Sequence, residues 1–386
     1  MIEFSGMARF VALLVFLIFP LSIQGAALVP APPTLKAKSY LLVDGDSGRV
    51  LVEHRADETL SPASLTKIMT GYVIAHELAL GTVKANDEVA VSVKAWRTGG
   101  SRMFIREGTR VRLEDLVRGI VIQSGNDASI AAAEHVAGSE DAFVELMNQQ
   151  AARLGMSHTQ FTNVTGMPDD AHFSTARDLA QLSRQLINEF PEHYAIYQEK
   201  YFTYNDIRQP NRNNLLWRDK TVDGIKTGYT EEAGYCLIAS ASRDGMRLIS
   251  VVLGAASEEV RARESEKLLS YGFRFFRTHE LFEAEQVLET AQVWYGDEDL
   301  VDLGLEEKVV LTIPRGEYEN MQAEIDLDQV IEAPLSAGDV VGRLRVMLGE
   351  ETLYESSLVV LSAVGEANVL KRIWHGIYLF FREFFS

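Results

Sequence analysis

The chain has 386 residues, too many for one ordinary hydrophobic core of about 150 residues, so we expect two domains with shorter appendages. Its 47% of hydrophobic and 24% of charged residues are typical of a folded protein. The formal net charge of -18, without any concentrated run of Lys and Arg, argues against a nucleic acid partner because a polyanion would be repelled.

The N-terminus has the pattern of an export signal. Arg9 precedes an apolar run over residues 10–23, and small residues follow it up to Ala27. A membrane-spanning helix is the alternative, but Pro20 breaks the run, which is shorter than the ~20 residues that a span needs. We therefore predict that residues 1–27 are a signal peptide and that the protein is exported.

The first folded elements follow a proline-rich spacer at residues 29–33, which cannot enter a helix or a central strand. Residues 39–43 and 50–53 flank the turn sequence Asp-Gly-Asp-Ser-Gly at 44–48, which predicts a β-hairpin. An amphipathic helix is predicted next, because apolar residues recur at helical spacing over residues 65–73.

The middle of the chain is helical in character. Helices are predicted over residues 113–122 and 128–137, and the second of them ends at Gly138. A third helix is predicted to start after Ser139, which suits an N-cap, and to end at Gly155.

The pattern then returns to strands. Residues 234–240 and 247–253 are joined by Arg-Asp-Gly at 243–245, which predicts a second hairpin, and a helix is predicted over 258–277. Cys236 is the only cysteine, which excludes an intramolecular disulfide, and its apolar neighbours predict a buried strand position. Strands, a helical insert, strands and a helix predict an α+β fold in which helices cover a sheet.

The C-terminal part of the chain differs in composition. Short alternating runs separated by Gly, Pro, Asn and Asp predict a small all-β domain over residues 282–365, without a catalytic cluster. These runs are 308–313, 323–327, 340–347 and 353–361.

The last segment, residues 367–386, carries apolar residues at helical spacing with basic residues between them. The apolar positions are Leu370, Ile373, Trp374, Ile377, Phe381, Phe384 and Phe385. Such a helix is too charged to span a bilayer and suits the surface of a lipid membrane. A helix packed on the all-β domain is the alternative, although so many aromatic residues at a chain end are costly to leave in water.

Three short motifs carry the chemistry, and the first pairs Ser64 with Lys67. The two side chains lie three residues apart at a predicted helix N-terminus and so share one face. Lys67 can take the serine proton only if burial or a neighbouring cation lowers the pKa of its amine. The backbone N–H of Ser64 is available to a developing oxyanion. Alone, this motif fits equally an N-cap serine beside a solvent-facing lysine.

The other two motifs supply polar groups for a substrate. Ser124 and Asn126, separated by a glycine between two predicted helices, offer a hydroxyl for proton transfer and an amide for a carbonyl, although an ordinary capping loop has the same sequence. Lys226, Thr227 and Gly228 lie on a predicted outer strand, whose edge can pair with an extended peptide. The lysine and the threonine suit a substrate carboxylate, and the glycine leaves room for it.

Together, the three motifs resemble those of the low-molecular-mass penicillin-binding proteins, the serine-type D-alanyl-D-alanine carboxypeptidases of peptidase family S11. The resemblance covers nearly the whole chain, with the all-β domain and the amphipathic tail. Its segments are 61–70, 123–128, 211–213, 223–228 and 272–276. It implies a β-lactamase-like peptidase domain over residues 34–278.

The resemblance also implies roles for the motif residues. Ser64 attacks the carbonyl of the penultimate D-alanine of a peptidoglycan pentapeptide, and Lys67 takes the serine proton. Ser124 passes a proton to the departing D-alanine, and Asn126 holds the acyl side of the substrate. Water then hydrolyses the acyl-enzyme without a metal or a cofactor. β-Lactam antibiotics are expected to act as covalent inhibitors.

Binding of the terminal carboxylate is assigned by the same resemblance to Lys226 and Thr227, helped by Arg212 or Arg261. The backbone N–H of Tyr229 joins that of the nucleophile in the oxyanion hole. Many relatives carry His at this position, where this chain has Tyr229. The backbone N–H is present with either residue, whereas any proton transfer by a His side chain is lost.

Other functions are compatible with the same three motifs. A β-lactamase would not ordinarily carry the all-β domain and the terminal helix, and a D,D-endopeptidase stays open because the motifs do not define the acceptor side. An inactive penicillin-binding scaffold would have no chemical need for four intact motif residues. We therefore predict a D,D-carboxypeptidase on the periplasmic face of the cytoplasmic membrane, attached through its C-terminal helix.

Overall fold

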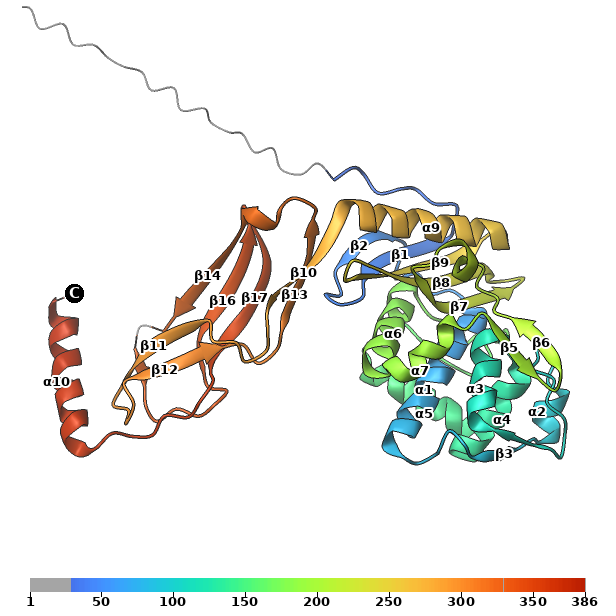
Figure 1. The fold of residues 1–386 in the computed structure, drawn as a ribbon, viewed down its shortest axis with the longest axis horizontal. Helices are drawn as coiled ribbons and strands as arrows, with labels where there is room; N and C mark the ends of the chain where they lie inside the picture. Colours follow the sequence, from blue (N-terminus) through green and yellow to red (C-terminus); the bar gives the residue numbers. More distant parts are fainter. Residues whose placement is uncertain (1–28, 329, 386) are drawn as a thin grey trace, which may run out of the picture.

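The computed structural model describes residues 29–385 except position 329, so the predicted signal peptide lies outside the described residues. The molecule is elongated, with an N-terminal domain (residues 29–275) at one end and a β domain (residues 276–366) beside it (Figure 1). The terminal helix α10 (Val369–Phe385) lies at the end opposite the N-terminal domain.

A five-stranded antiparallel sheet organises the N-terminal domain. Its order is β2-β1-β9-β8-β7, so the first two strands of the chain pair with strands from the end of the domain. The strands are β1 (Ser39–Asp44), β2 (Val50–His54), β7 (Val222–Thr230), β8 (Gly234–Arg243) and β9 (Met246–Ala255). Both predicted hairpins are confirmed, and β7 is an edge strand as predicted.

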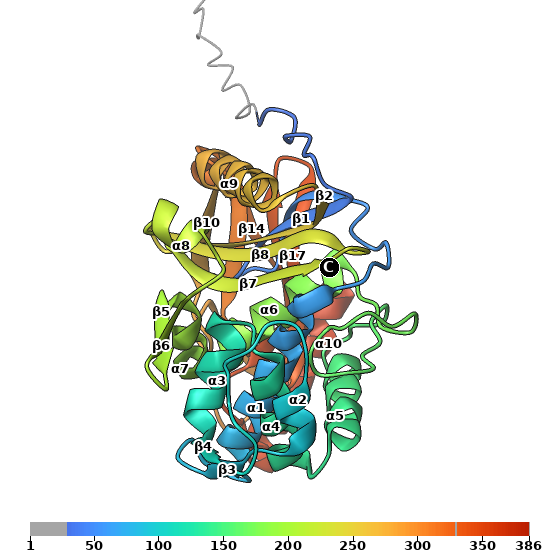
Figure 2. The same ribbon diagram turned by 90° about the vertical axis from the view of Figure 1, so that its right-hand side faces the viewer.

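Each face of this sheet is covered, because successive strand residues point to opposite sides. Leu42 and Leu248 pack toward α9 (Glu258–Phe275), whereas Leu41 and Ile249 pack toward the helical insert. Figure 2 shows the resulting layers, with α9 above the sheet and the inserted helices below it. Helix α9 ends two residues before the predicted position 277, because Phe276 already begins a strand.

The helical insert lies between β2 and β7. It begins with a short 3-10 turn, η1 (Ala63–Thr66), followed by α1 (Lys67–Leu80). The other helices are α2 (Val93–Arg97), α3 (Leu113–Ile122), α4 (Asn126–Ala137), α5 (Glu140–Arg153), α6 (Ala176–Glu189), α7 (Pro191–Tyr194), η2 (Ala195–Gln198) and α8 (Leu215–Arg218). Two short ribbons pair β3 (Glu88–Ala90) with β4 (Arg110–Arg112), and β5 (Tyr201–Tyr204) with β6 (Ile207–Pro210).

Helix α1 differs from the amphipathic helix that the sequence predicted. Every residue from Lys67 to Ala75 is buried, because α3, α4, α5, α6 and β7 contact this helix from several sides. Two other helices agree with the sequence analysis. Helix α3 has the predicted bounds, and Ser139 caps α5 by accepting the N–H of Ala142.

The β domain contains a six-stranded sheet of order β14-β16-β17-β12-β11-β15 and a ribbon of β10 with β13. Its elements are β10 (Phe276–Phe282), β11 (Glu289–Trp294), β12 (Leu300–Gly304), β13 (Val309–Pro314), η3 (Tyr318–Asn320), β14 (Met321–Leu327), β15 (Ile331–Glu332), β16 (Val340–Leu348) and β17 (Glu351–Val360). Strands β13, β14, β16 and β17 match predicted runs. Strand β10 extends across the gap between the two predicted domains, residues 279–281.

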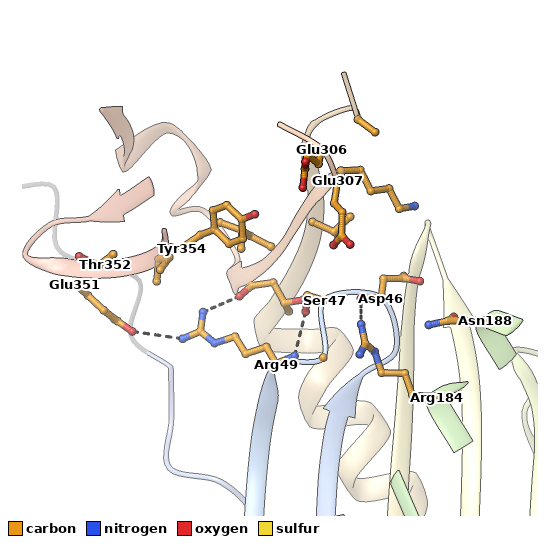
Figure 3. A pocket seen from close by; sticks show the side chains of 17 residues that line it. Asp46, Ser47, Arg49, Arg184, Asn188, Glu306, Glu307, Glu351, Thr352 and Tyr354 are labelled. Atoms are coloured by element: carbon orange, nitrogen blue, oxygen red, sulfur yellow. Dashed lines mark hydrogen bonds and ion pairs between the residues drawn. The ribbon is translucent and has the colours of Figure 1, made fainter. Parts of the chain in front are cut away.

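Polar contacts join the two domains. The buried Asp44 accepts a hydrogen bond of 2.5 Å from the Thr278 hydroxyl, and the hydroxyls of Ser47 and Thr312 lie 2.6 Å apart. Arg49 donates to the backbone oxygen of Thr312 at 2.6 Å. A cleft of about 1020 Å³ lies beside these contacts (Figure 3), but no residue of the three motifs lines it.

Candidate active site

The nucleophile candidate lies in the turn η1, so the helix N-terminus falls at Lys67, three residues later than Ser64. The turn is held from two sides. The Thr66 hydroxyl donates to the backbone oxygen of Ala63 at 2.8 Å, and β7 packs against the turn. A Cβ added to Gly228 would lie 3.3 Å from the Leu65 side chain, which is between Ser64 and Lys67, so the first and third motifs are in contact.

Lys67 is the best defined group of the site. Its Nζ lies 2.7 Å from Asn126 Oδ1, 2.6 Å from the backbone oxygen of Thr165 and 3.3 Å from Ser64 Oγ. Burial, followed by the positive charge of Arg212, lowers the pKa of Lys67 to about 7.

These distances suit a general base. A neutral amine has two hydrogens and one lone pair. When Lys67 donates its hydrogens to Asn126 and Thr165, its lone pair is left to accept the proton of Ser64 Oγ, 3.3 Å away. Near neutral pH, a large fraction of the lysine can therefore accept the serine proton.

The second motif brings a hydroxyl and an amide to the same place. Ser124 lies between α3 and α4 with a φ of 64°, and its buried Oγ has no hydrogen-bond partner among the described residues. A buried hydroxyl without a partner is rare in folded proteins and is common at functional sites. Asn126 is held at both ends of its amide, because Oδ1 accepts from Lys67 and Nδ2 donates to the backbone oxygen of Gly99 at 2.8 Å.

The third motif adds positive charge at the sheet edge. Lys226 and Thr227 are both buried on β7, and the Lys226 Nζ donates to the backbone oxygen of Thr227 at 3.0 Å. Burial, followed by the charges of Lys67, Arg212 and Arg261, holds the pKa of Lys226 well below its ordinary value. Four basic side chains therefore share one region, which favours an anionic ligand such as a carboxylate.

The three other predicted substrate-binding side chains differ in their positions. Arg212 is exposed, and its Nε donates to the backbone oxygen of Gln123 at 3.0 Å. Arg261 is buried and donates to the backbone oxygen of Gly228 at 3.2 Å, so it supports the strand that carries the third motif. The Tyr229 ring is 50% exposed and lies 4.3 Å from the Tyr235 ring, centroid to centroid.

Asp127 is an organising residue that the sequence analysis missed. Its buried carboxylate accepts four backbone N–H groups, from Met103, Phe104, Ile105 and Ala128, at 2.8 to 3.2 Å. This carboxylate therefore fixes the loop whose start, at residue 99, holds the Asn126 amide. Its charge also raises the pKa of Lys67, against the effect of burial. An Asp in the first turn of a helix is too common to reveal this role by itself.

The sequence analysis also missed the role of residues 162–172, a segment that contacts Lys67 and the turn η1. Asn163 Oδ1 accepts the N–H groups of Thr165, Gly166 and Met167, at 3.1, 2.7 and 3.2 Å, which sets the position of the Thr165 carbonyl. His172 Nδ1 accepts the N–H of Thr162 at 3.0 Å, so Nε2 carries the hydrogen that faces the Thr66 hydroxyl at 2.7 Å. The loop therefore holds both the lysine and the nucleophile turn.

We expect Gly166→Ala to disrupt this arrangement. Gly166 has a φ of +79°, and its added Cβ would lie 1.8 Å from the backbone oxygen of Ala63. Thermal unfolding should show a loss of about 2 kcal/mol or more, with a large loss of penicillin acylation. Gly155→Ala is the control, because Gly155 has a φ of +72° but no atom within 4 Å of its added Cβ. It should cost about 1 kcal/mol and leave acylation unchanged.

We expect Asp127→Asn to move the pH dependence of acylation. The substitution removes the negative charge that raises the pKa of Lys67, so the neutral amine should form at lower pH. The midpoint of the acylation rate against pH should fall below about 7, by about half a pH unit.

Asp178→Asn is the matched control for this prediction. Its carboxylate is also buried and accepts hydrogen bonds, from the backbone N–H of His158 and the Thr159 hydroxyl, but it does not contact Lys67. An unchanged midpoint in Asp127→Asn, or the same shift in both variants, would contradict the electrostatic role of Asp127.

Comparisons with known proteins agree with this geometry. A family model described as D-alanyl-D-alanine carboxypeptidase matches residues 26–257, and one described as penicillin-binding protein 5, C-terminal domain, matches residues 276–366. The D-alanyl-D-alanine carboxypeptidase DacC of Escherichia coli is 44% identical over 397 residues, which covers 100% of this chain and 99% of that protein.

Solved structures give the same result. Penicillin binding protein 5 from Haemophilus influenzae has a TM-score of 0.85 and 41% identity, covering 87% of this chain and 100% of that chain. Penicillin-binding protein D2 from Listeria monocytogenes, in an ampicillin-bound form, has a TM-score of 0.58 and 31% identity, covering 63% and 100%. The chain belongs to the D-alanyl-D-alanine carboxypeptidase family of penicillin-binding serine peptidases.

Proposed function

We propose that this carboxypeptidase removes the terminal D-alanine from peptidoglycan pentapeptides through an acyl-enzyme on Ser64. The observation that carries the proposal is the buried Lys67 amine, with a pKa of about 7 and its Nζ 3.3 Å from Ser64 Oγ. The basic side chains around Lys226 supply the anion-binding region that a substrate ending in a carboxylate needs.

In the first step, Ser64 Oγ bonds to the carbonyl carbon of the penultimate D-alanine while its proton moves to Lys67 Nζ. The oxyanion is stabilised by the backbone N–H groups of Ser64 and Tyr229. The C–N bond to the terminal D-alanine then breaks, and its amine takes a proton from the Ser124 hydroxyl, which regains one from Lys67. Water attacks the resulting ester, which releases the shortened peptide and restores Ser64.

Release of D-alanine from a peptide ending in D-Ala-D-Ala tests this proposal. We expect release by the parent protein and none by Ser64→Ala. Without release by the parent, the proposal would fail, and assays with cross-linked peptide dimers and with penicillin would distinguish an endopeptidase from a β-lactam hydrolase.

We further propose that the protein is exported and works on the periplasmic face of the cytoplasmic membrane. Two features support this location. The pattern of residues 1–27 is that of a signal peptide, and α10 exposes a row of apolar side chains, among them Leu370 and Trp374. Among the residues that the structure describes, no helix has both the length and the apolar composition needed to cross a bilayer.

Deleting residues 371–386 is expected to release the protein from membranes without loss of activity on a soluble peptide. Helix α10 lies at the end opposite the N-terminal domain (Figure 1), so the catalytic residues keep their contacts. Fractionation of cells, followed by the D-alanine assay on both fractions, would measure this. A full-length protein that is found in the soluble fraction would contradict attachment through α10.

A further inference from the structure

The terminal helix α10 contacts the β domain through its polar side. His375 is 9% exposed, and its Nδ1 accepts the backbone N–H of Tyr295 at 2.8 Å. The Tyr378 ring stacks on the Trp294 ring with centroids 5.2 Å apart. The helix is therefore held by the protein in a defined orientation at the far end of the β domain (Figure 1).

The opposite side of α10 is apolar and exposed. Its large side chains are between 47% and 81% exposed, and they recur at spacings of three and four residues, on one side of the helix. They are Leu370, Ile373, Trp374, Ile377 and Phe381. An exposed row of this kind is typical of a surface that is covered by a partner or a lipid.

The basic residues at the start of α10 are already paired with carboxylates of the same protein. Lys371 Nζ lies 2.9 Å from Asp299 and donates to the backbone oxygen of Asp297 at 3.1 Å. Arg372 lies 2.5 Å from Glu366. These two charges are therefore compensated before any anionic headgroup approaches.

The β domain adds strong negative charge beside the helix. Residues 276–366 contain 21 Asp and Glu against 5 Lys and Arg, so this domain has a net charge of -16, out of -18 for the whole chain. Asp297, Asp299 and Glu366 surround the start of α10, and Glu332 lines a groove together with Arg372. The electrostatic screening length is about 8–10 Å near physiological salt, so carboxylates in contact with α10 can act on headgroups beside a membrane-bound helix.

We propose that α10 binds a lipid surface of low negative charge by burying its apolar side, and that the adjacent carboxylates disfavour anionic headgroups. This proposal rests on the proposed membrane attachment. It reverses the usual behaviour of basic interfacial helices, which bind anionic lipid more tightly and lose affinity as salt increases.

Vesicle binding by the protein without residues 1–27 tests the proposal. One vesicle preparation is phosphatidylcholine alone, and the other contains about one third phosphatidylglycerol. We expect binding to phosphatidylcholine, about threefold weaker binding with phosphatidylglycerol at low salt, and recovery of this loss at ~0.5 M salt. Tighter binding to phosphatidylglycerol that weakens with salt would overturn the proposal and leave attachment intact. Absence of binding to both preparations would overturn attachment itself.

A double variant tests the role of the ion pairs. Asp299→Asn with Glu366→Gln leaves Lys371 and Arg372 without these carboxylates, so we expect binding to phosphatidylglycerol vesicles to become at least as tight as to phosphatidylcholine.

The matched control, Glu324→Gln with Glu355→Gln, removes the same charge from ion pairs with Arg345 and Arg343 in the sheet of the β domain. It should keep the preference of the parent for phosphatidylcholine. Equal changes in the two variants would overturn the local pairing, and thermal unfolding would confirm that both variants fold.

Discussion

Ser64→Ala is expected to abolish both D-alanine release and covalent labelling by penicillin, with kcat/KM lowered by about four to six orders of magnitude. The Ser64 hydroxyl lies 3.3 Å from the Lys67 amine, which takes its proton in the proposed reaction. Alanine has no oxygen with which to form the ester. The buried Ser124 hydroxyl belongs to another loop, and in the proposed reaction it passes a proton to the leaving group and forms no bond to the carbonyl carbon. Residual acylation at that position is therefore not expected.

The mass of the intact protein after incubation with penicillin measures this result directly. The parent should gain the mass of one penicillin molecule, and Ser64→Ala should gain none. Ser61→Ala is the control, because it removes a hydroxyl three residues earlier in the same segment and should leave labelling unchanged. A labelled Ser64→Ala protein would rule out Ser64 as the nucleophile.

Lys67→Arg is expected to slow acylation by about three to four orders of magnitude while keeping a positive charge in the site. Arginine cannot lose its proton in a protein, so it cannot take the proton of Ser64. The parent rate should rise as pH rises through about 7, because the neutral amine is the active form and its fraction increases above the pKa. The variant should lack this rise.

Acylation by a fluorescent penicillin between about pH 5 and pH 9 measures both effects. Lys94→Arg is the control, since Lys94 is exposed and pairs with Glu140 outside the site. Thermal unfolding of each variant would show whether the larger guanidinium is accommodated. An acylation rate in Lys67→Arg that still rises through pH 7 would exclude the lysine as the base.

Much of the fold follows from residues close together in the chain. The hairpin of β1 and β2, the bounds of α3 and the cap at Ser139 depend on turn and cap residues within a few positions of each element. The predictions failed where contacts between residues far apart in the chain determine the structure. Helix α1 is buried on all sides from Lys67 to Ala75, and β10 continues directly from the end of α9 to pair with β13.

In the C-terminal helix, too, some features follow from the local sequence and others depend on distant contacts. Its bounds and its apolar side follow from local spacing, which the structure confirms. Its contact with the β domain was only the alternative in the sequence analysis, and its partners could not be named there because His375 and Tyr295 are 80 residues apart in the chain. The signal peptide and the location of the protein stay predictions.

The sequence by itself determined which functional groups this protein has: a serine, two lysines, a second serine and an amide, in motifs whose order is typical of one enzyme family. Only the tertiary structure decided their chemical state. Lys67 meets Asn126 across 59 positions and Thr165 across 98, and the resulting burial lowers its pKa to about 7. Loss of water around a charge depends on every atom packed near it, and no local pattern of residues contains that information.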